Sequence, residues 1–428
     1  MSILRAMYAG VAGLAAESGA LGVVGDNVAN TSTVGFKQSR AIFADILGAA
    51  VGSREAGSGV RMVRAQQLFG QGAIVNTGQA TDVALSGDGF LVASGAVDGI
   101  QGTFYTRAGQ LTMRTDGTIV SPEGLAVQGY PADGKGGYAS TVGDIKLPNG
   151  SIPPRPTSTL KVSANLDANA TTPAAAWDPQ NPSATSNLST AVTVYDSLGA
   201  SHSLELYFRK TAAGSWEYHA LAKGSEVTGG TPGTNVEVAT GTLTFSGSGA
   251  LQANALTAGG TVSFAGATAA QAIALDFGKP TSTGGTGTDG ITQFGSPSSV
   301  LAQSQDGYSA GSLSGVKIDS DGTVNGVYTN GQTLAAGKLA VAKFRSNDGL
   351  GRAGHNLWVA TRESGDPALG GVGTGGRAAL VSGSLEQSNV DLTTQFVELI
   401  AHQRSFQANS KTITTADQML QELMTIKQ

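Results

Sequence analysis

Apolar side chains recur every seven residues at both ends of this chain. A strict seven-residue repeat keeps one seam on one side of a slightly supercoiled helix, and that seam needs a helical partner to cover it. Near the start, the two interleaved rows are Met7, Leu14, Leu21 and Val28, and Leu4 and Val11. Near the end, the main row is Leu385, Leu392, Leu399, Phe406, Ile413 and Leu420, with Phe396 in the second row. The sequence therefore predicts a terminal helix at each end that seeks other helices.

The two helices differ in how strongly their sequences support them. The first is expected over residues 2–29, is small or apolar on every side, and contains Gly10, Gly13, Gly19, Gly22 and Gly25. Each glycine costs about 0.8–1 kcal/mol of helix stability relative to alanine. This helix should therefore be disordered alone in water and form only among neighbours. The second is expected from about Asp391 to Ile426, because Ser388 and Asp391 have the spacing of a capping box.

Between the helices the sequence predicts β structure, with Asp-Gly and Asn-Gly turns such as 116–117, 321–322 and 330–331. A proline-rich stretch after Leu147 and a linker-like stretch at 278–299 favour one β domain inserted into another. The expected fold class is mainly β with long terminal α-helices. The expected domains are a helical one (1–30 and 385–428), a connecting segment (31–70), a discontinuous first β domain (71–145 and 303–384) and an inserted outer β domain (146–302). Both termini should then lie at the same end.

Composition excludes several classes of function. A net charge of −5 without a basic run gives no footprint for nucleic acid or a membrane surface. The absence of cysteine excludes disulfides, thiolate metal sites and cysteine nucleophiles. The uncharged run from Ala6 to Ala16 is too short to span a bilayer, so we expect no membrane insertion and no cleaved signal peptide. Low charge, 13%, suits a surface that packs against copies of itself.

Candidate chemical sites are weak. The histidines at 202, 219, 355 and 402 lack metal-ligand spacing, and His402 is interpreted as a polar surface or interface residue. The G-x-G-x-x-G match at 371–376 lacks a βαβ context, and Asp319-x-Asp321-Gly322 is a hairpin turn rather than a calcium loop. The aromatic residues Trp177, Trp216 and Tyr218 are expected in the core. We therefore predict no catalytic, cofactor or metal residue and no enzyme.

Short motifs flank the helices. The segment after the first helix, with Ala29, Asn30, Thr33, Gly35, Phe36 and Lys37, resembles the A-N-x-x-T-x-G-F-K signature of flagellar rod and hook axial proteins. Phe43-Ala44-Asp45 looks like the hook proteins in particular, and Phe104 to Gly109 is similar to the family's first β domain. The second half of the resemblance includes Ser388, Asn389, Asp391, Gln403, Arg404 and Asn409. It covers about 1–145 and 303–428; across 146–302 no tight motif is recognised.

The resemblance implies a structural subunit of the bacterial flagellar hook. Such subunits form a flexible tube, a universal joint between the basal body and the filament, outside the cell. It also implies type III export without a cleaved signal, a homo-polymer, and contacts with rod, hook-cap and hook–filament junction proteins. The residues leave three alternative functions open: a distal rod or other axial protein, a secreted β-rich adhesin or carbohydrate-binding protein, and a Gly-rich hydrolase. The apolar rows could also be ordinary core, with each helix docked on the chain's own β body.

Overall fold

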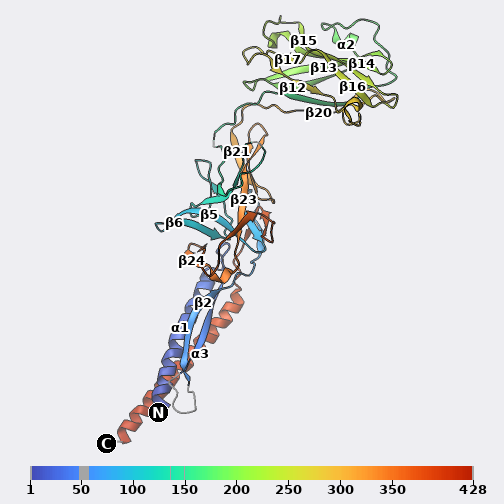
Figure 1. The fold of residues 1–428 in the computed structure, drawn as a ribbon. Coiled ribbons are helices and arrows are strands. Elements are labelled where there is room, and N and C mark those ends of the chain that lie inside the picture. The colour runs from blue at the N-terminus through green and yellow to red at the C-terminus, as the bar shows by residue number, and fades with distance from the viewer. Residues whose placement is uncertain (1, 48–56, 135, 149, 427–428) are drawn as a thin grey trace. The chain divides into compact units, whose positions relative to one another are not determined.

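The computed structural model describes residues 2–47, 57–134, 136–148 and 150–426. Within these the chain is mainly β with one long helix at each end, α1 (Ser2–Ala29) and α3 (Leu392–Ile426), which confirms the expected fold class (Figure 1). The chain divides into two compact units, one of residues 1–149, 315–327 and 333–428, the other of 150–314 and 328–332. The four-part domain division expected from the sequence stays a prediction.

The first unit contains both long helices and most of the short strands. After α1 its elements are β1 (Ser39–Leu47), β2 (Gly57–Gln67), β3 (Ile74–Asn76), β4 (Val83–Ser86), β5 (Phe90–Val97), β6 (Ile100–Thr106), β7 (Thr112–Met113), β8 (Ile119–Val120), β9 (Ala126–Pro131) and β10 (Gly143–Asp144). The chain returns through β21 (Leu313–Ile318), β22 (Thr323–Tyr328), β23 (Thr333–Lys343), η3 (Asn347–Gly349), β24 (Gly351–Gly354), β25 (Leu357–Val359), β26 (Ala368–Gly371), β27 (Ala379–Ser382) and β28 (Ser384–Glu386) before α3.

The main sheet of the first unit has the strand order β21-β22-β23-β9-β5-β6-β25-β24. The N-terminal strands β9, β5 and β6 therefore lie between strands of the returning segment in one sheet, and β5 pairs β6 with Val92 opposite Tyr105. Two small sheets, β27 with β4 and β28 with β3, join the C-terminal segment to the N-terminal one. An aromatic cluster of Phe90, Phe344 and Trp358 fills part of the core. Neither half of the first unit can complete its sheet alone.

The second unit is a β structure of two principal sheets around one apolar core. The five-stranded sheet has the order β12 (Leu188–Tyr195), β13 (Ser201–Ala212), β14 (Ser215–Lys223), β15 (Asn235–Phe245) and β16 (Leu251–Gly259). The three-stranded sheet has the order β19 (Ala274–Asp276), β11 (Thr159–Asn165) and β20 (Ser299–Gln305). Its short elements are α2 (Pro182–Thr185), η1 (Gly224–Glu226), β17 (Thr261–Val262), β18 (Gln271–Ala272) and η2 (Thr281–Thr283). Trp216 and Tyr218 are buried in this core, as expected. The expectation for Trp177 is wrong, because it is half-buried outside the core and stacks on His219.

The turn interpretations hold in the structure. Asp116-Gly117 and Asp321-Gly322 each close a hairpin in the same way, with the aspartate carboxylate accepting the backbone N–H of the threonine two residues on, at 3.0 Å. Each glycine has a positive φ, 85° for Gly117 and 84° for Gly322, which a side chain would disfavour. The glycines of 371–376 lie between β26 and β27, and no helix follows them. Among the described residues no group of acids and histidines could hold a metal ion.

Two expectations about the ends of the chain need correction. Leu385 does not belong to the helical row, because it lies in strand β28, buried and paired with Val75. The capping box is also wrong: Asp391 alone caps α3, accepting the N–H of Thr394 at 2.8 Å, while Ser388 Oγ accepts the N–H of Val390. A carboxylate directly before the first helical residue reaches the free N–H groups without help from Ser388.

The apolar length of α1 also differs from expectation. From Leu4 to Ala29 the helix is long and apolar enough to cross a membrane, with a mean hydropathy of 1.3. The expected apolar run ends at Glu17, but the two carboxylates of this span, Glu17 and Asp26, lower its mean hydropathy only slightly. Core helices of soluble proteins and signal sequences share this length and composition.

Gly109 offers a test of close backbone packing within the N-terminal part of the first unit. A Cβ at this position would lie 1.7 Å from the carbonyl oxygen of Val83. We expect Gly109→Ala to lower the free energy of unfolding by more than about 2 kcal/mol, because backbone must move. The control Gly315→Ala, where a Cβ meets nothing within 4 Å, should stabilise by up to about 1 kcal/mol. Urea unfolding of both variants measures this; equal effects would contradict the assignment.

Candidate assembly interface

The terminal helices α1 and α3 run side by side in opposite directions (Figure 1). Gly10 and Gly13 of α1 make the closest approach. A Cβ on Gly10 would lie 2.9 Å from Cγ1 of Ile413, and one on Gly13 would lie 2.7 Å from Nδ2 of Asn409. The helices therefore meet through the small face of α1, whose buried residues are Gly10, Gly13, Ala16, Ala20, Val24 and Asn27. These glycines weaken the isolated helix but allow close packing.

A long hairpin of β1 and β2 packs on another side of α1. A Cβ on Gly19 would lie 2.6 Å from Sδ of Met62, and one on Gly59 would lie 2.9 Å from Cβ of Ala12. The ring of Phe43, on β1, lies 6.3 Å from that of His402 on α3. The segment expected only as a connection is thus a third structural part of the helical region.

Polar contacts set the register between the two helices. Nδ1 of His402 lies 2.6 Å from a carboxylate oxygen of Glu17, so His402 is an interface residue within the chain. The buried Asn27 side chain donates to Oε1 of Gln395 at 2.9 Å, and bonds both the carbonyl and the N–H of Ser39. A buried amide that is satisfied in only one alignment discriminates against slipped packings.

The apolar rows are only partly covered within one chain. Leu4 is 56% exposed and Phe396 51% exposed, and Val11, Leu392 and Phe406 are also exposed. The remaining row members are half-buried: Met7, Leu14, Leu21, Val28, Leu399, Ile413 and Leu420. Val397 and Ile400, outside the predicted rows, are exposed as well. The chain thus presents more apolar helix surface than its own contacts cover, and pairing of the two rows with each other stays a prediction.

The motif after α1 ends the helix and turns the chain. Asn30 donates from Nδ2 to the carbonyl of Asp26 at 2.9 Å, and its Oδ1 accepts the hydroxyl of Thr33. Gly35 has a φ of 69°, and a Cβ there would lie 2.6 Å from the carbonyl carbon of Arg107. The N–H of Gly35 donates to the carbonyl of Glu386 at 2.7 Å. The glycine is therefore required by both its conformation and its contact.

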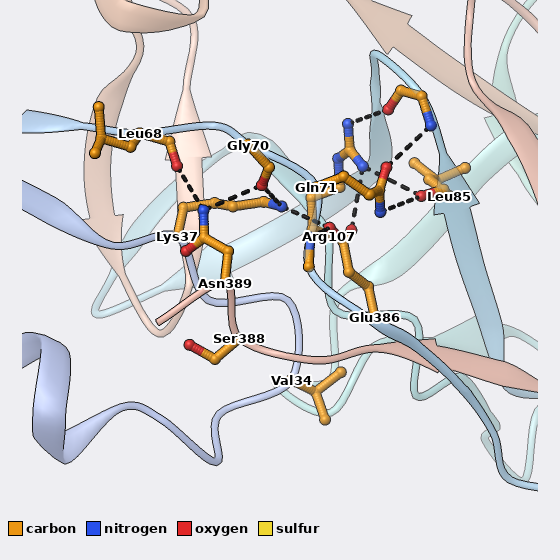
Figure 2. Close-up of polar contacts among 12 residues, drawn as sticks. Val34, Lys37, Leu68, Gly70, Gln71, Leu85, Arg107, Glu386, Ser388 and Asn389 are labelled. Atoms are coloured by element: carbon orange, nitrogen blue, oxygen red, sulfur yellow. Dashed lines mark hydrogen bonds and ion pairs between the residues drawn. The ribbon is translucent and has the colours of Figure 1, made fainter. Parts of the chain in front are cut away.

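Lys37 then enters a buried cluster of charges (Figure 2). Its Nζ lies 2.6 Å from Oε1 of Glu386, and Nη1 of Arg107 lies 3.1 Å from Oε2 of the same carboxylate. Lys37 and Glu386 are fully buried and Arg107 is nearly so. Burial lowers the pKa of Lys37, and the hydrogen bond and negative charge of Glu386 oppose that shift. Glu386 is thus shared by two cations.

Backbone groups satisfy most of the remaining hydrogen-bonding capacity of this cluster. The N–H of Gly72 donates to Oε1 of Glu386 at 2.9 Å, Lys37 donates to the carbonyl of Gly70 at 2.7 Å, and Arg107 donates to that of Gly87 at 2.6 Å. Nε of Arg107 is buried without a hydrogen-bond partner within the described residues. A buried ion pair held by such hydrogen bonds loses much stability when one partner is removed. The cluster fastens the chain before β1 to the strand before α3.

The C-terminal motif continues the attachment (Figure 2). Oδ1 of Asn389 accepts the N–H of Gln38 at 2.7 Å, and its Nδ2 donates to the carbonyls of Leu68 and Gly70. Phe36 is buried nearby in sequence, whereas Ala29, Gln403 and Arg404 are exposed, the last two on α3. The motif residues thus divide into those that fasten the helices to the β body and those left on the surface.

The sequence motif singled out Lys37, but it did not indicate that Lys37 pairs with Glu386 or that Arg107 shares this carboxylate. Arg107 lies within the motif segment Phe104 to Gly109, and Glu386 directly follows the apolar Leu385. A charged residue beside an apolar one in a chain with so little charge is the signal that could have indicated burial. The β1–β2 hairpin was also missed, because neither strand shows a regular alternation of apolar and polar residues.

The cluster predicts a large difference between buried and exposed carboxylate pairs. Glu386→Ala leaves two buried cations unpaired and should lower the free energy of unfolding by about 3–5 kcal/mol. Lys317→Ala removes a pair with Asp319 in which both side chains are substantially exposed, and should cost at most about 1 kcal/mol. Chemical denaturation of both variants checks this. Similar losses in the two would mean that the buried cluster does not hold the segments.

Models of flagellar axial protein families match four segments of the chain. Family models match as follows: flagella basal body rod protein at 7–37, flagellar hook protein FlgE/F/G D1 domain at 84–166, flagellar basal body protein FlaE D2 domain at 165–308, and flagellar basal body rod FlgEFG protein C-terminal at 381–426. The matches include the segment 146–302, where the sequence motifs gave no recognition.

Individual relatives cover the chain from end to end. The flagellar hook protein FlgE of Escherichia coli K12 is 33% identical over 422 residues, 97% of this chain and 98% of that protein. The FlgE of Treponema pallidum is 32% identical over 99% of this chain and 100% of that protein. A crystal structure of Helicobacter pylori flagellar hook protein FlgE2 has a similar fold, with a TM-score of 0.50 over 73% of this chain and all of that one at 16% identity. The resemblance found in the motifs is confirmed, and this chain belongs to the flagellar hook protein family.

Proposed function

We propose that this chain, a structural subunit of the flagellar hook, polymerises through its terminal helices into a flexible helical tube. The observation that carries the proposal is the exposed apolar surface of α1 and α3, including Leu4, Val11, Leu392, Phe396 and Phe406. Exposed apolar side chains gathered on paired helices are typical of a surface that another subunit covers.

The polymer is proposed to be open and head-to-tail. The exposed face of α3 carries large side chains such as Phe396, Val397 and Ile400, whereas α1 presents Gly22 and Gly25, where a Cβ would meet nothing within 4 Å. We propose that the unlike faces meet in a heterologous contact, because heterologous contacts that do not close extend into a helical assembly, whereas a two-fold contact would end at a dimer. The row residues are proposed to pack within and between subunits in this assembly.

The four expected domains are proposed to divide the work of the tube. The helical domain would keep the tube intact from the inside. The β domains would lie outside it, and the outer β domains would slide over one another when the tube bends. The family is a structural one, so we propose no catalytic role, cofactor or metal.

The proposed location is the hook outside the bacterial cell, reached by flagellar type III export without a cleaved signal. A helix as rich in glycine as α1 gains little from forming alone, so it can pass a narrow channel unfolded and become ordered on packing. The proposed partners are many copies of the same chain, with rod, hook-cap and hook–filament junction proteins at the ends of the tube. No nucleic acid and no membrane insertion are proposed.

Removal of both helical ends tests the proposal. A chain lacking residues 1–30 and 391–428 keeps both β units but loses the proposed contacts between copies. We expect it to stay folded by circular dichroism, because Lys37, Arg107 and Glu386 remain, and to form no tubes by electron microscopy. Tubes from the truncated chain, or collapse of its β structure, would contradict the proposal.

A single glycine on the outer side of α1 provides a finer test. Gly22→Leu meets nothing within 4 Å in the single chain and favours the helix by up to about 1 kcal/mol, so monomer stability should stay equal or rise. Tube formation should be lost if this face packs closely in the polymer. The matched Gly13→Leu, placed against Asn409, should destabilise the monomer itself. Normal tubes from Gly22→Leu would show that this face is free.

A further inference from the structure

A pocket of about 360 Å³ lies beside the motif that follows α1. One wall is the segment Asn30 to Lys37, and the others come from the end of β2, the turn between β8 and β9, and the hairpin that joins β24 to β25. All of these belong to the first unit. The pocket therefore lies next to the helices proposed for assembly, but no contact described so far uses it.

Two buried acceptor atoms of the lining residues have no partner. Oε1 of Gln67 and Oε2 of Glu123 are buried and make no hydrogen bond within the described residues. The amide end of Gln67 is already committed, since Nε2 donates to Oγ of Ser39 at 2.9 Å. A buried acceptor that lacks a hydrogen bond lowers the stability of the fold, because it has lost its water without gaining a donor. Both therefore favour a ligand that supplies N–H donors.

One carboxylate beside the pocket has no oppositely charged partner within the described residues. Lys37 pairs with Glu386, Arg352 lies 3.4 Å from Asp26, and His355 lies 3.5 Å from Asp98. Arg114, close in sequence to the turn, donates to the carbonyl of Gly124. For Glu123 no ion pair occurs within the described part of the chain. A ligand for this pocket should accordingly carry a positive charge.

The rim of the pocket has an unusual backbone. His355 and Asn356 form the two-residue loop between β24 and β25, with φ values of 51° and 58°. Loops of this kind ordinarily contain Asn-Gly, because side chains resist positive φ. Asn356 is tied to the motif by donating from Nδ2 to the carbonyl of Val34 at 2.8 Å. Two successive residues other than glycine at positive φ strain the backbone, and such strain is typical of positions where the side chains have a function.

We propose that this pocket is a socket for a basic side chain of α3 from a second copy, bound by the carboxylate of Glu123 and the amide oxygen of Gln67. The inference rests on the proposed polymer. Arg404 and Lys411 are exposed on α3, and neither has an acidic partner within the described residues. A guanidinium offers five N–H donors in a planar fork and can meet a carboxylate and an amide oxygen together, so Arg404 is the assigned residue.

The energetic test is a charge exchange. Glu123→Gln keeps the shape and removes the charge, and should raise the critical concentration for polymerisation about tenfold; Glu123→Arg should raise it further. Arg404→Glu should do the same, and the double variant Glu123→Arg with Arg404→Glu should recover most of the loss. Glu363→Arg, an exposed position outside the pocket, is the control and should have little effect. Monomer thermal unfolding is measured for every variant.

The outcomes separate the inference from the proposed function. If the unaltered chain forms no polymer, the proposed function fails. If it polymerises and both Glu123 variants do so equally well, the pocket holds only water and the inference fails. If the Glu123 variants are weakened and only an exchange with Lys411→Glu restores assembly, the assignment to Arg404 is overturned.

Proximity can be measured without relying on energies. Because the chain has no cysteine, a chain with Glu123→Cys can be copolymerised with one carrying Arg404→Cys and treated with a short bifunctional thiol reagent. We expect cross-linked dimers in the mixed polymer, and none when Glu363→Cys replaces Glu123→Cys. Equal cross-linking from both positions, or none from either, would overturn the inference.

Discussion

Glu386 carries a buried negative charge that Lys37 and Arg107 share, and the geometry of the helical region depends on it. The three residues come from the segment after α1, from the loop after β6 and from the strand before α3. Because a buried charge without its partner is costly, the ion cluster holds the base of both helices in one arrangement. The Gly35 turn and the Asn389 bonds add to this attachment.

Beyond this base the helices are weakly supported. Glycines allow α1 to approach α3 and β2 closely, yet each glycine also lowers the stability of the isolated helix. The resulting contact uses the small face of α1 and leaves large apolar side chains on α3 exposed. A firmly attached base with an incompletely covered helix pair is suited to a subunit that completes its structure in a polymer.

Much of the fold could be predicted from the sequence, and the errors have physical causes. Periodicity located α1 correctly and α3 to within a residue, because a seven-residue row needs a helix. The same row wrongly included Leu385, since spacing alone cannot distinguish a buried strand residue from a helical one. The motifs pointed to Lys37 and Asn389, but the partner of Lys37 is 349 positions away, and only the folded chain reveals such a contact. The small residues of α1 were evident in the sequence, but periodicity did not show that their face, rather than the apolar rows, packs on α3.

The most direct test of the account is amide hydrogen exchange of α1 and α3 in the monomer and in the assembled polymer. The account predicts that the amides of both helices exchange much faster than those of the core β strands in the monomer, because the helix pair is only weakly held there, and that they become strongly protected in the polymer. The core strands of both compact units should be protected equally in each state. Strong protection of α1 and α3 already in the monomer, unchanged on assembly, would contradict it, because the helices would then be ordinary core of a single chain.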